Sequence, residues 1–181
     1  NVSSAHLENF KNLDGIALAK SELIDELSKN NILILNKDDK YFNFFKKKAK
    51  DKDIKVLSFS KKLNSNSDIR LISKKKINKQ VKLYVEVNNK KIDFNISLSV
   101  LPYIENLLGV VSVISIFFDI NKFKKNLFSN YNVPLGRGNL IKYRIKNKII
   151  NIIDESYNSN PLSFEFSLNK FNNLNINNKK K

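Results

Sequence analysis

Apolar segments and short polar breaks alternate along the first sixty residues. Residues 13–27 carry apolar side chains at helical spacing, which predicts a helix. A continuous apolar run at residues 31–36 (NILILN) predicts a buried strand. Residues 41–51 (YFNFFKKKAKD) then predict a helix with an aromatic face, and residues 54–60 (IKVLSFS) predict another strand. Strand, helix and strand in this order indicate a parallel βαβ unit.

The period of the pattern changes after residue 68. Three segments alternate apolar with polar residues, as half-exposed strands do, and VNNKKI between the last two is a plausible hairpin turn. This region predicts a small antiparallel sheet. Residues 104–119 (IENLLGVVSVISIFFD) are apolar but too short to span a bilayer, so they predict a buried helix. Residues 121–131 (NKFKKNLFSNY) predict a second, amphipathic helix.

Glycine and proline gather at one place, residues 133–139 (VPLGRGN), which is a candidate domain hinge. Residues 140–154 then predict a hairpin that feeds a buried strand. A helix is expected from residue 160, with Asn160 as N-cap and Pro161 in its first turn. A lone strand–helix pair cannot bury its own faces. We therefore expect that the chain is truncated at its polar end, residues 175–181, or that its last unit is disordered.

Composition limits the classes of protein to which this chain can belong. With 181 residues, 41% of them hydrophobic, the chain can form a sizeable core. The absence of cysteine excludes disulfides and thiolate metal sites. No apolar run is long enough to insert into a membrane, and the first ten residues lack the layout of a signal peptide, so a cytoplasmic setting is expected.

The formal net charge of +16 points at first to nucleic acid. The lysines are scattered, however, and far outnumber arginine, which is the better reader of bases and phosphates. Enrichment in Lys, Asn and Ile together is typical of an AT-rich genome. Codon bias then accounts for the charge, and no specific nucleic-acid partner is expected.

The stretch at residues 152–161 (IIDESYNSNP) carries the most specific chemistry. It predicts a strand, a short acidic turn and a helix N-terminus. In open α/β domains, ligands gather at the carboxyl ends of strands, and helix N-termini attract anions. Carboxylates there can accept hydrogen bonds from ribose hydroxyls or help to organise Mg²⁺. The same local pattern also fits an ordinary capped turn with no binding site.

The stretch DESYNSNP resembles the D-[DE]-S-Y-N-A-N-P signature of the Mur ligase family, in the branch that adds D-alanyl-D-alanine. Four further segments are similar to family segments in the same order: residues 5–27, 32–42, 103–114 and 133–139. They resemble A-H-L-E-x-F-G-S-x-x-G-I-A-x-A-K-x-E, a strand ending in N-x-D-D, the helix that usually begins H-x-x-x-N-A-L-A-A, and the G-R-G junction. The resemblance is close at residues 1–42 and 101–164, and weak between them.

This resemblance implies an α/β fold. Residues 1–136 would form the C-terminal half of a Mur ligase central ATPase domain, with a parallel sheet, helices and a small antiparallel sheet. Residues 137–181 would begin a Rossmann-like C-terminal domain with its first strand–helix unit. No G-x-x-G-K-[ST] loop is present in the sequence, and in the family that loop lies upstream. The chain is therefore expected to be a fragment that is inactive alone.

The implied reaction is ATP-dependent amide formation. The terminal carboxylate of UDP-MurNAc-tripeptide takes the γ-phosphate of ATP and becomes an acyl phosphate. The amine of D-alanyl-D-alanine then displaces phosphate. ATP and Mg²⁺ are the implied cofactors, and the full-length enzyme is expected to be a cytoplasmic monomer.

Individual roles follow from the matching positions. His6 would ligate Mg²⁺, and Lys20 would do so once carbamylated. Asn106 would read the adenine, although Pro102 stands where the family has His. Arg137 would approach the γ-phosphate, so that Lys20 and Arg137 are the expected catalytic residues.

The signature itself supplies the remaining residues. Glu155 would contact the ribose or nucleotide, with Asp154 as the alternative for that role and Asn158 beside them. Tyr157 and Asn160 would shape the cleft. A strand-end cluster of Asn36, Asp38 and Asp39 is expected to be structural.

Three alternatives remain open at this stage. One is another Mur ligase or a folylpolyglutamate synthase-like ligase, although residues after the acid differ there. The second is a basic nucleic-acid-binding domain, and the third is a structural module in which residues 154–161 only form a capped turn.

Overall fold

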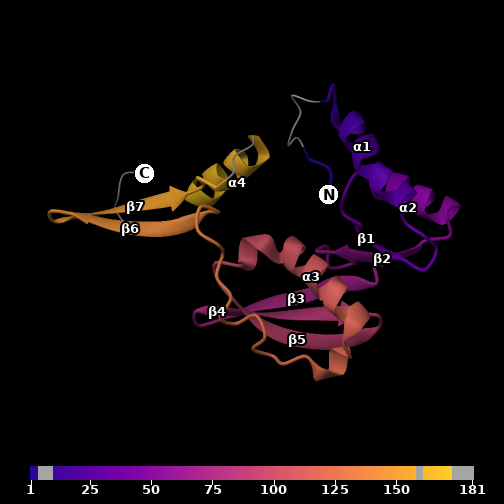
Figure 1. The fold of residues 1–181 in the computed structure, drawn as a ribbon. Helices are drawn as coiled ribbons and strands as arrows, with labels where there is room; N and C mark the ends of the chain where they lie inside the picture. The colour runs from indigo at the N-terminus through magenta and orange to yellow at the C-terminus, as the bar shows by residue number, and fades with distance from the viewer. Residues whose placement is uncertain (4–9, 158–160, 173–181) are drawn as a thin grey trace. The chain divides into compact units, whose positions relative to one another are not determined.

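The computed structural model describes residues 1–3, 10–157 and 161–172. The chain divides into two compact units (Figure 1). The first comprises Asn1–Val2 and Asn12–Asn132, and the second comprises Ser3–Lys11 and Val133–Lys181. The predicted boundary between two Mur ligase domains, at residues 136 and 137, stays a prediction.

The first unit is built on one five-stranded sheet in the order β1-β2-β3-β4-β5. β1 pairs with β2, and β2 with β3, in parallel, whereas β3–β4 and β4–β5 are antiparallel. The strands are β1 (Ile32–Asn36), β2 (Lys55–Ser60), β3 (Ile69–Ile77), β4 (Gln80–Val87) and β5 (Lys90–Ser97). The predicted α/β class is confirmed, and the antiparallel strands extend the parallel sheet through the β2–β3 pairing.

Two helices cover one face of the parallel strands. In α1 (Leu13–Asp25), the Asn12 side chain accepts a hydrogen bond from the Gly15 N–H at 2.9 Å and caps the first turn. The crossover helix α2 (Phe42–Asp51) connects β1 to β2, as the sequence predicts. These helices share a buried cluster with Leu33, Leu35 and Val56 of the sheet; its members are Ala17, Ile24, Phe45, Ala49 and Ile54.

The opposite face is covered by α3 (Ile104–Phe117), which contacts β1, β2 and β3. Side chains alternate along a strand, so Ile34 and Leu57 face away from the α1–α2 cluster and toward this helix. The prediction that this apolar helix is buried is only half right. Its inner face is buried, but Val110 and Val113 are each 46% exposed and Phe117 is 73% exposed, because the described residues contact one face only. No helix in the described ranges is long and apolar enough to cross a membrane.

Turn chemistry explains the β4–β5 hairpin. Asn88 and Asn89 both have positive φ, 48° and 66°, the conformation that a two-residue hairpin turn with right-handed twist requires. Alternate residues of β4 are buried. The predicted half-exposed strands and their hairpin are therefore confirmed.

The predicted helix over residues 121–131 is wrong. The chain forms the 3₁₀ turn Ile120–Lys122 and then a series of i→i+3 turns. Several tertiary contacts hold this segment against β5. Among them, the Asn95 N–H donates to the Lys125 carbonyl at 2.7 Å, and the Phe128 ring stacks edge-on to Phe94 with centroids 5.2 Å apart. These contacts, together with a 3.6 Å ion pair between Lys125 and Asp93, outweigh the weak helical preference of the sequence.

The second unit holds an antiparallel hairpin of β6 (Asn139–Ile145) and β7 (Lys148–Asp154), followed by α4 (Pro161–Asn172). The hairpin is confirmed, and Pro161 begins the helix as predicted. The expected burial of the second strand is wrong, since no residue of β7 is buried and Ile149, Ile150 and Ile152 are 43–52% exposed. The proposed cap Asn160 lies outside the described residues.

Asp68 joins β2 to β3 where backbone pairing is short. Only two residue pairs connect these strands. One oxygen of the Asp68 carboxylate accepts from the Ser58 N–H at 2.8 Å and from the Ser58 hydroxyl at 2.6 Å. The carboxylate thus replaces a backbone carbonyl that the ladder lacks.

We predict that Asp68→Ala lowers the free energy of unfolding of the first unit by about 1–3 kcal/mol, because Ser58 is 7% exposed and its N–H would be left without an acceptor. Urea unfolding followed by circular dichroism measures the loss, and hydrogen exchange at Ser58 locates it. The matched control, Asp68→Asn, keeps an acceptor oxygen and should lose less. Equal stability of the alanine variant and the wild type would contradict this role.

Candidate functional site

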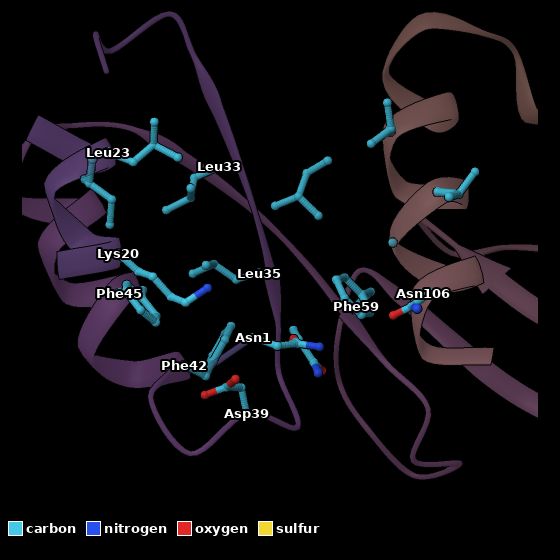
Figure 2. Close-up of a pocket in the computed structure, with 16 residues that line it drawn as sticks. Asn1, Lys20, Leu23, Leu33, Leu35, Asp39, Phe42, Phe45, Phe59 and Asn106 are labelled. Atoms are coloured by element: carbon cyan, nitrogen blue, oxygen red, sulfur yellow. The ribbon is translucent and has the colours of Figure 1, made fainter. Parts of the chain in front are cut away.

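A pocket of about 560 Å³ lies along the edge strand β1 of the first unit. Figure 2 shows Lys20 on one side of it and Asn106 on the other, with Leu35 and Asn1 between them. Because the pocket reaches both faces of β1, its walls come from all three helices of the unit. Most of the lining is apolar, from Leu23, Ile24, Leu33, Ile34, Leu35, Phe42, Phe45, Phe59, Val110 and Val113.

Lys20 and Asn106 come to this pocket from distant parts of the chain. Lys20 lies on the exposed side of α1, and Asn106 lies exposed in the first turn of α3. The structure thus brings together one expected catalytic residue and one expected adenine-binding residue. An apolar wall beside an amide and an ammonium can accept a planar apolar ring that carries polar or anionic groups.

The turn after β1 is held by its own polar side chains. The Asp38 carboxylate accepts from the Ser60 hydroxyl at 2.7 Å and from the Lys61 N–H at 2.8 Å. The Asp39 carboxylate accepts from the Val2 N–H at 2.6 Å and from the Tyr41 N–H at 2.8 Å. These bonds fix the carboxyl ends of β1 and β2, which is the structural role that the sequence analysis expects.

Glu105 connects this turn to α3. One of its carboxylate oxygens accepts from the side-chain amides of Asn1, at 2.6 Å, and Asn36, at 2.9 Å. The other oxygen pairs with the Lys61 ammonium at 2.7 Å. Asn106 follows Glu105 directly, so these bonds also fix the helical turn that presents the Asn106 amide to the pocket.

In the second unit, the glycine-rich segment folds against the acidic signature. The Tyr157 N–H donates to the Gly136 carbonyl at 3.1 Å, and the Gly138 N–H donates to the Asp154 carbonyl at 2.7 Å. The guanidinium carbon of Arg137 lies 4.3 Å from the centre of the Tyr157 ring. Two segments that the sequence analysis singled out separately therefore form one locus.

Both acids of the signature have local partners. Asp154 accepts from the Ser156 N–H at 3.0 Å, and its pKa is lowered first by the Ser156 hydroxyl, then by the backbone N–H groups of Ser156 and Gly136. Glu155 accepts a hydrogen bond from the Ser167 hydroxyl of α4. These bonds hold the turn and the helix, and a contact of either acid with a nucleotide stays a prediction.

Two predicted site residues, His6 and Asn158, lie outside the described residues. Within the ranges that the structure does describe, no three His, Asp or Glu side chains gather as metal ligands. Lys20 has no recorded carboxylate partner there. The metal-binding roles of His6 and carbamylated Lys20 thus stay predictions.

Sequence reasoning missed one residue of these loci, Glu105, and one contact, that of Tyr157 with Arg137. Glu105 shows no motif of its own, and its partners are far away in the chain. Tyr157 was noticed only as a signature residue, and nothing in the sequence indicates that it lies under Arg137.

Comparison with known proteins shows what the chain is similar to. The Mur ligase middle domain matches residues 1–114. UDP-N-acetylmuramoyl-tripeptide–D-alanyl-D-alanine ligase of Rickettsia prowazekii is 31% identical over 168 residues, covering 93% of this chain and 36% of the relative. The ligase of the same name from Buchnera aphidicola (subsp. Baizongia pistaciae) is 31% identical over 175 residues, covering 96% and 36%. The chain thus spans about a third of the length of these relatives.

Solved structures give the same fold. MurF from Acinetobacter baumannii superposes with a TM-score of 0.72 at 20% identity, over 91% of this chain and 34% of that one. MurF from Thermotoga maritima, solved in complex with ADP, has a TM-score of 0.65 at 21% identity, over 93% and 37%.

We predict that the Asp154 carboxyl titrates below its ordinary pKa of 3.8, since its hydrogen bonds favour the charged form. A lowered folded-state pKa stabilises the fold above the unfolded value, and the gain is lost as pH falls through the lowered pKa. Ser156→Ala should raise the pKa toward 3.8, because it removes the largest cause of the shift.

Carbon-detected NMR titration of Asp154 measures this pKa. Ser129→Ala, a change in the other unit, is the control and should leave the midpoint of Asp154 unchanged. An identical midpoint in Ser156→Ala and wild type would refute the assignment.

Proposed function

This chain belongs to the Mur ligase family, whose middle domain matches residues 1–114, and we propose that it works as part of an ATP-dependent ligase that joins D-alanyl-D-alanine to UDP-MurNAc-tripeptide. The Rickettsia and Buchnera relatives are named for this activity, which supports this choice within the family. The observation that carries the proposal is that Lys20 of α1 and Asn106 of α3 line the same pocket beside β1.

The proposed reaction has two steps. The terminal carboxylate of the tripeptide attacks the γ-phosphate of ATP, giving an acyl phosphate and ADP. The amine of D-alanyl-D-alanine then attacks the acyl carbon, the tetrahedral intermediate collapses, and phosphate leaves. Negative charge develops on the transferred phosphoryl group and then on the oxyanion, so cations and hydrogen-bond donors are what the protein must supply.

Asn106 supplies the base recognition in this proposal. Its side-chain amide has both a donor and acceptor, which matches the edge of adenine, and the apolar wall of the pocket suits the ring. The ADP complex of the Thermotoga neighbour supports nucleotide use, since that protein shares the fold.

Arg137 supplies a phosphate contact. A guanidinium offers planar, paired N–H donors that match phosphate oxygens, and it stays charged at every pH at which the enzyme works. Asp154 and Glu155 hold the turn beside it, and we propose that the oxygen of Glu155 not engaged by Ser167 is the one that can reach a ribose hydroxyl.

Magnesium would require His6 and a carbamylated Lys20. The unmodified ammonium of Lys20 would repel a cation, whereas the carbamate is an oxygen ligand of the kind that Mg²⁺ prefers. Bound Mg²⁺ would neutralise phosphate charge. Lys20 lines the pocket with its side chain exposed, so CO₂ can reach it.

We predict that Arg137→Ala, made in a ligase that contains this chain, lowers kcat by about 10²-fold or more, because a donor to the developing negative charge is lost. Phosphate release that depends on D-alanyl-D-alanine measures kcat. Arg144→Ala removes an exposed arginine of β6 in the same unit and should stay within about twofold of the wild type. Undiminished turnover in Arg137→Ala would refute the phosphate contact.

We predict that Asn106→Ala raises the KM for ATP by about 5- to 150-fold, which corresponds to about 1–3 kcal/mol for a specific hydrogen bond to the base. Initial rates over a range of ATP concentrations measure the change. Asn121→Ala, in the 3₁₀ turn after α3, is the matched control and should leave KM unchanged. A change in kcat with no change in KM would contradict recognition of the base by Asn106.

A further inference from the structure

Arg137 lies in a backbone conformation that its neighbours fix. Gly136 and Gly138 have φ values of 75° and 79°, in the left-handed region that favours glycine. A Cβ at residue 136 would lie 2.9 Å from the Tyr157 nitrogen. The segment can therefore approach Tyr157 only because residue 136 has no side chain.

The main chain is held on both sides of Arg137 by the acidic signature. Gly136 accepts from the Tyr157 N–H, and Gly138 donates to the Asp154 carbonyl, as described above. The Cα of Arg137 is thus placed by two hydrogen bonds to residues of one turn, before any contact of its side chain.

The side chain meets the ring of Tyr157. At 4.3 Å from the ring centre, the guanidinium is within range of a cation–π interaction. Tyr157 is 68% exposed, so burial of its ring in a core does not explain its position. The ring instead lies against the Arg137 guanidinium.

Stacking restrains the guanidinium through one of its faces. The five N–H donors of arginine lie in the plane of the group, at its edge. An aromatic ring against the face limits the swing of the side chain without using those donors.

We propose that Tyr157 is a positioning residue that holds the Arg137 guanidinium ready for an anionic phosphoryl group. The role of that phosphoryl group rests on the proposed function, whereas the restraint of Arg137 by the ring does not. Tyr157 acts here through Arg137, and its hydroxyl is not needed.

The chain is well suited to a direct test, because it contains only three arginines, Arg70, Arg137 and Arg144. Arg70 is held by Glu86 through two N–H···O contacts of 3.1 Å, and Arg144 is exposed on β6. These two are internal references for a paired and an exposed side chain. Proton–nitrogen NMR spectra of the arginine Nε–H groups in the 181-residue chain resolve all three.

The variants compared are Tyr157→Phe, which keeps the ring, and Tyr157→Leu, which removes it. In wild type and Tyr157→Phe we expect the Arg137 side-chain protons to be shifted upfield by the ring current. In Tyr157→Leu we expect that shift to be lost, while Arg144 stays unchanged. Unchanged backbone amides in β6 and β7 show that the hairpin remains folded, and the high exposure of Tyr157 makes this the expected result.

Titration with inorganic tripolyphosphate tests whether the Tyr157 ring strengthens phosphate binding by Arg137. We expect the Arg137 Nε signal to respond at about two- to fivefold lower concentration in wild type and Tyr157→Phe than in Tyr157→Leu, the factor that an exposed cation–π contact provides. The response of Arg144 reports the general attraction of a chain of charge +16 for a polyanion, and should be equal in all three proteins.

Two results would overturn the proposal. One is an Arg137 signal that shows no ring-current shift in wild type, or keeps it in Tyr157→Leu. The other is an equal tripolyphosphate response of Arg137 in all three proteins. Failure of the proposed function would instead appear as full ligation activity in Arg137→Ala, with the ring-current result unaffected.

Discussion

The first unit depends on side-chain oxygens that complete the hydrogen bonding of its parallel strands. Parallel strands end at the same edge of a sheet, where backbone N–H groups lose their partners, and buried N–H groups without acceptors are costly. Asp68 provides an acceptor for β2, and Asp38 provides another for the residue that follows this strand. The same edge is where an α/β sheet binds ligands. Asn36 and Asp39, from the turn at the end of β1, line the pocket, and Glu105 joins Asn36 to α3.

Local signals in the sequence were sufficient where the cause of an element is local. The Asn12 cap and the apolar spacing of α1, the Asn88–Asn89 turn and the alternation in β4 can be read from adjacent residues. The prediction of a helix over residues 121–131 failed because contacts with β5 decide the structure of this segment. They include a main-chain hydrogen bond and an aromatic pair. An aromatic pair contributes about 0.5–1.5 kcal/mol beyond its buried area, which exceeds the small differences in helix propensity among these residues.

For the candidate site too, the sequence predicts what depends on neighbouring residues and misses what depends on tertiary contacts. Lys20 and Asn106 were named from the family resemblance, and no periodicity could have placed them in one pocket, because that depends on how α1 and α3 cover opposite faces of the sheet. Glu105 was missed because a carboxylate with three distant partners resembles any surface acid in the sequence. The isoleucines of β7 were read as buried from their continuity alone. A continuous hydrophobic run shows that a strand could be buried, but it does not show that a partner covers it. In the described hairpin no residue of β7 is buried.

Arginine is scarce in this chain, so the positions at which it occurs are informative. Thirty of the 33 basic residues are lysine, by subtraction of the three arginines, and this excess follows the Asn and Ile enrichment of an AT-rich composition. The charge of lysine sits on a compact ammonium at the end of a flexible side chain, whereas the guanidinium of arginine is planar. Arg70 uses that plane to reach both oxygens of Glu86, and Arg137 uses it to lie on Tyr157 between two glycines that no side chain could replace without strain. A lysine at residue 137 would keep the charge and lose the stacked, edge-presenting geometry. The two glycines place the main chain of Arg137 and the ring lies against its side chain, so both act on the same guanidinium.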